Sequence, residues 1–474
     1  MTGGLRKTAS HLTIAAMFCV GGIALHGAKP AHAADLGGDC CADLEERVAE
    51  LEATTVRKGN KKVSVQLYGQ TNKAVLFWDD GAEQNAYVVD NNYESSRFGV
   101  KGNAKITGDW SAGYRLEIES TTAASNNVNQ YNPGDDPGFG GLNVRHSYMY
   151  VNNKNLGEVR WGLTATPIYN ITKDTNVTEL EDTMHSDNRM NQSFFLRPKG
   201  FDTEADLSNL RWSDISRCYD SSNAFVCSTR KNGIAYWSPK WEGFSASWGF
   251  FEDDMWGGAV RYQKEWGDLF EVGAGMGYEK TSDERLLAGG GGLNNFKRDI
   301  QDWAGSASIK HKPTGLFVVG AWSYSDNDDS NTVHAGVFTG TSDPLYNAWD
   351  IEFGIQRSVP WFGLDKLGDT SLWGTIAQEN DGLGAGTNLG RIPADRFLPA
   401  GTFANVGVDT EITGAQVDRW GIAFDQAIDS AMMHLYVVYQ HLTPEVDLVD
   451  SSLNGVNAPL DNFDLVYTGA RIYF

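Results

Sequence analysis

The sequence predicts an all-β protein: a 16-stranded antiparallel transmembrane β-barrel with an inward-folded third loop and a short N-terminal helical segment. From Val63 onward, apolar and polar residues alternate with a period of two in segments of about 9–13 residues, the length that a tilted strand needs to cross a bilayer. Short and long connections alternate between these segments. No later apolar run is long enough for a membrane helix, and the alternation of a barrel hides its hydrophobicity from a hydropathy window.

The first 33 residues have the features of a secretory signal peptide. Arg6 and Lys7 form a basic start, and the 14 residues from Leu12 to Leu25 form an apolar run. This run is too short to span a membrane. Ala31-His32-Ala33 fits a cleavage site, so we expect segment 1–33 to be removed.

Residues 34–60 differ from the rest of the chain, because their pattern is helical. Glutamates separate residues that recur at alternating spacings of three and four, which is a heptad seam: Cys41, Leu44, Val48, Leu51 and Thr55. About two heptads are marginal for an isolated helix in water. Two interpretations stay open, a short periplasmic coiled coil in which Cys40 or Cys41 links subunits, and a frayed helix or flexible tail.

The barrel domain is expected over residues 61–474. Its short connections lie at one end and its long ones at the other, so both termini are predicted in the periplasm. Residues 206–214 could form another strand, but one more crossing would reverse the direction of every later strand, so we assign them to the third loop. The strand candidates are 63–78, 96–107, 111–121, 142–152, 157–165, 232–241, 244–251, 257–266, 269–280, 301–311, 316–325, 347–359, 369–381, 417–428, 431–442 and 462–474.

Basic residues share one face of four consecutive strands. A charge on the lipid face at mid-membrane costs about 2–4 kcal/mol, so this face must line a lumen that holds water. Glu117 and Glu119 share the face of Arg115, while Val144, Tyr148 and Tyr150 are expected on the face opposite Arg145. The predicted basic wall consists of Arg97, Lys101, Arg115, Arg145 and Arg160.

Much the longest connection, residues 166–231, follows the fifth strand. A loop this long is usually functional when it is ordered. Folded into the barrel, it would set carboxylates opposite the basic wall and create a transverse field across a narrow, wet constriction. The alternative is an exposed loop whose acids are solvated. The candidate constriction acids are Asp174, Glu179, Glu181, Asp182 and Asp187.

Two cysteines of this loop, Cys218 and Cys227, suit a local disulfide in an oxidising periplasm, with two free thiols as the alternative. Without the signal peptide, 36 Lys and Arg stand against 61 Asp and Glu, a net charge of −25, which argues against nucleic-acid binding. The six histidines of the mature chain are scattered, and no G-x-S-x-G or H-E-x-x-H motif occurs. We therefore predict no catalytic residues, no metal site and no cofactor.

The last strand candidate ends on an aromatic residue, with Val466, Ala470, Ile472 and Phe474 on one face. This pattern resembles the C-terminal signature of bacterial outer-membrane barrels. With three further stretches, the mature chain resembles the general diffusion porins of Gram-negative bacteria, particularly the alphaproteobacterial type. These stretches are residues 65–80, residues 96–102, and residues 245–249 with 253–256.

This resemblance implies a homotrimer in the cell outer membrane, surrounded by lipid and lipopolysaccharide. It also implies a third loop folded against the basic wall and passive diffusion of small hydrophilic solutes and ions. Three other functions stay open: a channel selective for sugars or phosphate, an outer-membrane enzyme, and a secreted β-sandwich. Ion selectivity stays open too, because loop acids attract cations at the mouth whereas a basic wall favours anions at the constriction.

Overall fold

The computed structural model describes residues 63–134, 141–178, 180, 190–200, 207–208, 210, 211–216, 228–252, 254–287, 293–328, 345–359, 361–380, 392–393, 409–450 and 455–474. All of them belong to one compact unit, Thr54–Phe474. The predicted signal peptide, the helical segment 34–60 and the cysteines Cys40, Cys41, Cys218 and Cys227 lie outside the described residues.

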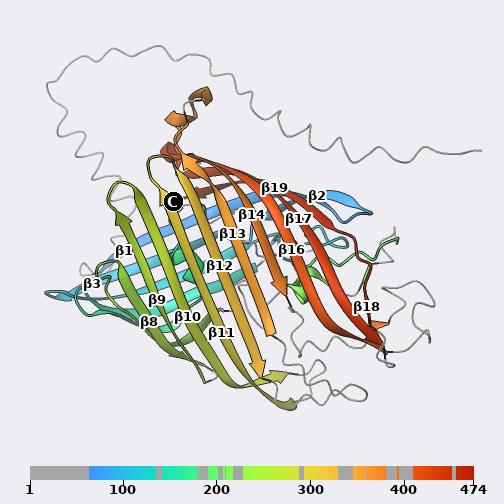
Figure 1. The fold of residues 1–474 in the computed structure, drawn as a ribbon. Coiled ribbons are helices and arrows are strands. Elements are labelled where there is room, and N and C mark those ends of the chain that lie inside the picture. The colour runs from blue at the N-terminus through green and yellow to red at the C-terminus, as the bar shows by residue number, and fades with distance from the viewer. Residues whose placement is uncertain are drawn as a thin grey trace, which may run out of the picture. The chain divides into compact units, whose positions relative to one another are not determined.

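Sixteen long antiparallel strands form one closed sheet (Figure 1), which confirms the predicted 16-stranded antiparallel barrel. Three short strands, β2, β15 and β18, join the same sheet, and two one-turn helices lie in the long third loop, α2 (Ile171–Asp174) and α3 (Trp212–Ile215). The strands are β1 (Ser64–Asp79), β2 (Gln84–Asp90), β3 (Arg97–Thr107), β4 (Trp110–Thr121), β5 (Gly141–Asn153), β6 (Gly157–Ala165), β7 (Arg230–Trp237), β8 (Phe244–Phe251), β9 (Met255–Trp266), β10 (Phe270–Leu287), β11 (Leu293–His311), β12 (Leu316–Asp328), β13 (Leu345–Arg357), β14 (Thr370–Asn380), β15 (Ile392–Pro393), β16 (Asp409–Ile428), β17 (Met433–Asp450), β18 (Gly455–Asn457) and β19 (Phe463–Tyr473).

The barrel closes where the first strand meets the last. β1 and β19 pair antiparallel from Gln70 opposite Tyr473 to Asp79 opposite Asp464. Beyond this ladder, the backbones of Gly69 and Phe474 exchange hydrogen bonds of 2.9 and 3.0 Å. Because hydrocarbon offers no partner for backbone polar groups, closure satisfies the edges that β1 and β19 would otherwise expose.

The second strand of the barrel is interrupted. β2 pairs with the end of β1 from Lys73 to Asp79, and β3 pairs with its start from Ser64 to Gln70. Between them, residues 91–96 leave the ladder. The side chains of Gln70 and Asn72 replace the missing pairs there, since both donate hydrogen bonds of 3.0 Å to the carbonyl of Glu94.

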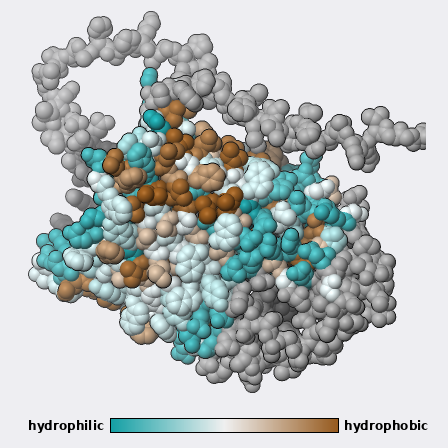
Figure 2. Space-filling model, in the orientation of Figure 1, coloured by the Kyte–Doolittle hydropathy of each residue, from teal (hydrophilic) through white to brown (hydrophobic). Residues whose placement is uncertain are grey.

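The two faces of each strand differ as the alternation predicts. Along β13, Trp349, Ile351 and Phe353 are exposed, whereas Asp350 and Glu352 are each only 1% exposed. Figure 2 shows apolar side chains gathered over the strands in view, with hydrophilic residues toward the margins. The apolar face thus meets the bilayer and the polar face lines the lumen. No helix among the described residues has the length and apolar character to cross a membrane.

One prediction about side-chain direction is wrong. A β-bulge in β5 lets Ile118 of β4 pair with Val144 and Glu117 pair with His146, so Arg145 is the extra residue. The side chains after the bulge change face, and Tyr148 pairs with Arg115 on the lumen side instead of facing lipid. A bulge adds one residue to one strand, which reverses the parity read from the sequence.

Removing the last aromatic ring should weaken the closing seam. A Cβ atom at Gly69 would lie 2.3 Å from Cζ of Phe474, so this ring covers the glycine of the neighbouring strand. We expect Phe474→Ala to lower the free energy of unfolding by about 1 kcal/mol, the upper range for a cross-strand pair. Urea titration of the protein refolded in lipid vesicles measures this change. Phe474→Tyr keeps the ring and should match the wild type, and equal stability of all three proteins would contradict the assignment.

Candidate functional site: the lumen wall and the third loop

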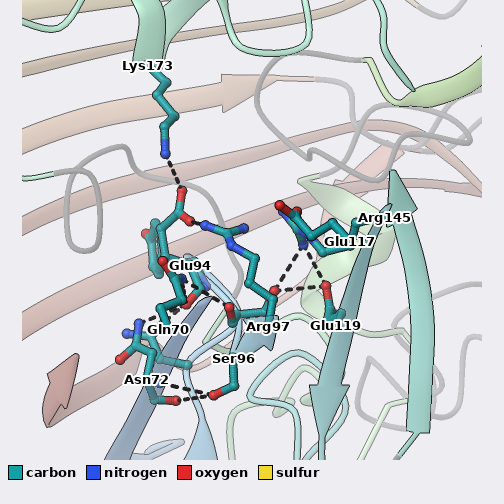
Figure 3. A network of polar contacts seen from close by, with 12 residues as sticks. Gln70, Asn72, Glu94, Ser96, Arg97, Glu117, Glu119, Arg145 and Lys173 are labelled. Atoms are coloured by element: carbon teal, nitrogen blue, oxygen red, sulfur yellow. Dashed lines mark hydrogen bonds and ion pairs between the residues drawn. The ribbon is translucent and has the colours of Figure 1, made fainter. Parts of the chain in front are cut away.

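The five predicted basic residues lie on β3 to β6, and four of them are paired with carboxylates of the same wall (Figure 3 shows two of the pairs). Arg97 pairs with Glu94, and Arg160 pairs with Glu158. The ammonium of Lys101 lies 4.3 Å from the centre of the Tyr68 ring, a cation–π contact. The wall is therefore a mixed network of charges rather than a row of separate cations.

Glu117 is the centre of this network. Its two carboxylate oxygens accept from Arg115 at 2.5 Å and from Arg145 at 3.0 Å. Arg145 also reaches Glu119 at 2.6 Å, and Tyr68 donates to Glu117 at 2.9 Å. Charge-assisted hydrogen bonds of this kind hold side chains in fixed positions, so the network gives the wall a defined shape.

Glu94 connects the wall to the third loop. It pairs with Arg97 of β3 and, at 2.9 Å, with Lys173 of α2 (Figure 3). Its backbone is held by β1 through Gln70 and Asn72. The loop therefore brings a cation to a wall carboxylate at this point, the reverse of the polarity expected from the sequence.

The start of the third loop contacts β9, β10 and β11. Asp174, the one predicted constriction acid among the described residues, forms an ion pair of 2.7 Å with Arg261 of β9. Val177 donates its N–H to Ser308 of β11 at 3.1 Å. The other predicted acids, Glu179, Glu181, Asp182 and Asp187, lie outside the described residues.

A later part of the loop packs against the first and last strands in an aromatic cluster. The ring of Phe194 lies 5.2 Å from that of Trp78 in β1 and 5.1 Å from that of Phe463 in β19. Trp212 of α3 lies 5.7 Å from Phe463. Within the candidate strand 206–214, the described residues from Trp212 onward belong to the helical turn α3 of the third loop.

Arg197 fixes the same segment to the first loop. It forms ion pairs of 2.8 Å with both Asp80 and Glu83, and its side chain is 1% exposed. Burial disfavours its charge, but the hydrogen bonds and charges of the two carboxylates outweigh this and raise the pKa of Arg197. Its carbonyl accepts from the N–H of Asp461, so this residue joins three connections of the barrel.

Several charged lumen residues were missed by the sequence analysis. Arg230 of β7 and Arg471 of β19 lie close enough to act electrostatically on Arg97. On β11, β13 and β14 the polar face carries carboxylates that are at most 7% exposed: Asp302, Asp350, Glu352 and Glu379. Acidic residues at every second position of otherwise apolar strands could have identified these carboxylates as lumen residues.

A cavity of about 740 Å³ lies beside α2, and residues of β9 to β11, β13, β14, β16 and β17 line it. Its lining includes Lys173 and Asp174 from the loop, Lys310 from β11, and Glu271, Asp369 and Asp429 from the strands and turns. A cavity lined by charged groups of both signs suits water and small polar solutes. Among the described residues, no group of three or more His, Cys, Asp or Glu side chains could hold a metal ion.

Comparison with known proteins gives one family. A family model described as Gram-negative porin matches residues 15–445. No curated protein matches the chain in sequence.

Several solved structures are similar to this chain at low identity. An anion-selective porin from Comamonas acidovorans is 17% identical with a TM-score of 0.52, over 87% of this chain and 100% of that chain. OmpT of Vibrio cholerae is 12% identical with a TM-score of 0.46, over 88% and 99%. OmpF of Salmonella typhi, in complex with daunomycin, is 12% identical with a TM-score of 0.46, over 89% and 100%. The first of these likenesses indicates the barrel fold and nothing beyond it.

Removing the guanidinium of Arg197 should release its segment of the third loop. Loss of one partner from a buried ion pair costs about 3–5 kcal/mol, because the remaining charges stay buried. We expect Arg197→Met to accelerate proteolysis and backbone hydrogen exchange of residues 190–200 while the barrel stays folded. Lys199→Met, an exposed neighbour in the same segment, is the matched control. Equal protection in both variants would show that Arg197 does not hold the loop.

Proposed function

The chain belongs to the Gram-negative porin family, and from this premise we propose how its lumen selects the solutes that pass. The protein is an outer-membrane channel for passive diffusion, and its family and fold point to a channel rather than to an enzyme.

The third loop narrows the channel from within the barrel. The contacts of Asp174 with Arg261 and of Val177 with Ser308 support this arrangement, because they tie the loop to the lumen faces of β9 and β11. The observation that carries the proposal is the ion pair between Lys173 and Glu94. It joins α2, which contacts β9 to β11, to the wall on the other side of the barrel. The narrowest passage then lies beside α2 and the wall of β3 to β5.

The transverse field acts between two walls of the barrel as well as between the wall and loop acids. The described lumen face of β3 to β7 and β19 carries the arginines Arg97, Arg115, Arg145, Arg160, Arg230 and Arg471, with carboxylates that neutralise part of their charge. The described lumen face of β10 to β16 carries an excess of carboxylates over the cations Lys310 and Arg419: Glu271, Glu279, Asp302, Asp350, Glu352, Glu379 and Asp425. Opposed charge in a wet constriction orients dipolar solutes and penalises nonpolar ones, which must displace ordered water.

We also propose that the channel is a homotrimer surrounded by lipid and lipopolysaccharide. The supporting observation is an ion pair between Lys73 of β1 and Asp90 of β2. Lys73 has the parity of Leu67 and Phe77, which are exposed on the lipid side of β1. Because charge on a lipid face is costly, this face is better covered by another copy of the chain than by hydrocarbon.

Single-channel recording tests the function directly. The refolded protein in a planar bilayer should conduct in stable steps that close in three equal parts, as expected for a trimer of independent pores. Small neutral sugars should also enter liposomes that contain it. Steps that close singly would refute the trimer alone, and no conductance from a folded, heat-modifiable barrel would refute an open channel.

Neutralising Glu94 should shift the channel toward anions. Glu94→Gln removes the carboxylate shared by Arg97 and Lys173, so one uncompensated positive charge is added at the constriction. A unit charge at about 4 Å in water is worth about 1 kcal/mol and acts on anions and cations with opposite sign, so the anion-to-cation permeability ratio should rise by up to roughly thirtyfold. The reversal potential under a salt gradient measures this ratio. Glu242→Gln, in an exposed turn pair with Lys264, should leave it unchanged, and an unchanged ratio in both variants would exclude Glu94 from the permeation path.

A further inference from the structure

The face of β10 that meets the third loop has three glycines in alternate positions, Gly273, Gly275 and Gly277. A Cβ atom at Gly273 would lie 2.0 Å from the carbonyl oxygen of Thr175. At Gly275 it would lie 2.8 Å from Cγ2 of Thr175, and at Gly277 it would lie 2.4 Å from Cγ2 of Ile168. No side chain fits between this face and the loop, so the glycines set the distance between them.

The next residue on the same face, Glu279, joins the two ends of the loop. Its carboxylate accepts from the N–H of Ile168 at 2.9 Å and from the hydroxyl of Ser228 at 2.8 Å. The hydroxyl of Thr166 lies 2.5 Å from that of Ser228. Glu279 is completely buried, and its two carboxyl oxygens contact these two ends of the loop.

Neighbouring strands complete the contact surface. The hydroxyl of Ser308 on β11 hydrogen-bonds the carbonyl of Thr175 and accepts from the N–H of Val177. Arg261 on β9 binds Asp174 and the carbonyl of Pro167. Three adjacent strands therefore contact one short stretch of loop through glycines in the centre and polar groups on both sides.

We propose that this surface is a seat for the third loop and sets the diameter of the channel. The glycines Gly273, Gly275 and Gly277 fix how near to the wall the loop lies. Glu279 is the positioning residue that holds the two ends of the loop. The proposal rests on the function proposed above, in which the loop narrows the lumen. A side chain added to the seat moves the loop away from the wall and into the passage. Loss of Glu279 leaves the loop at the wall without a fixed end, so its position fluctuates.

Gly275→Ala is the most selective change, because the added atom meets mainly loop side chains, Cγ2 of Thr175 at 2.8 Å and Cδ1 of Ile171 at 3.0 Å. Restoring a contact of 3.5–4.0 Å moves the loop by about 1 Å, and we expect a loss of roughly a tenth to a third of the single-channel conductance. Gly320→Ala is the matched control on the lipid face of β12, where the nearest atom is 3.8 Å away.

A second substitution should restore the conductance. Thr175→Ser removes the methyl group that collides with Ala at position 275 and keeps the hydroxyl that donates to the carbonyl of Ile171 at 2.8 Å. The double variant should therefore conduct more nearly like the wild type than Gly275→Ala does. General destabilisation of the barrel would lower the number of channels, but it would not lower the conductance of each one or be reversed by Thr175→Ser.

Glu279 is tested by a pair of variants in the same recording. Glu279→Gln keeps an acceptor for Ile168 and should give steady currents, whereas Glu279→Ala should give channels that flicker between conductance levels. Heat-modifiable mobility on gels checks that each variant folds. Unchanged conductance in Gly275→Ala together with steady currents in Glu279→Ala would overturn the proposal that this surface positions the loop, while leaving the channel function intact. A wild-type barrel that does not conduct would overturn the proposed function instead.

Discussion

A strand inside a bilayer has to find every hydrogen-bond partner within the protein, because hydrocarbon supplies none and each unsatisfied group costs several kcal/mol. In this chain the requirement is met at the seam between β1 and β19, which turns an open sheet into a closed one. Closure also separates side chains into two environments. Along the described strands, alternate residues meet lipid and those between them face the lumen, so the polar lumen follows from the same backbone constraint.

Charges in such a lumen are arranged in groups rather than singly. Glu117 forms ion pairs with two arginines, and Glu94 forms ion pairs with Arg97 and Lys173. Each pairing reduces the cost of taking charge partly out of water and fixes side chains that would otherwise sample many rotamers. The result is a wall whose charged side chains are held in fixed positions, as the proposed field across the passage requires.

Local periodicity made most of the fold predictable, whereas contacts between distant segments did not follow from it. The period of two located the strands and the faces of Arg97 and Arg115, because side-chain direction follows backbone pleat. The bulge at Arg145 has no such signal, so the faces of Tyr148 and Tyr150 were predicted wrongly. Glu94 precedes its strand, and Lys173 lies in an aperiodic loop. Their contact depends on how the whole barrel brings the two together, which no local pattern contains.

The aromatic cluster of Trp78, Phe194 and Phe463 has a consequence for the order of folding. Its members come from the first strand, the third loop and the last strand, so their contacts span most of the chain. Contacts of such large sequence separation form slowly, since a long loop must close before any of them is gained. We therefore expect the cluster to assemble after the seam has brought β1 beside β19, so that packing of this part of the loop stabilises barrels already closed.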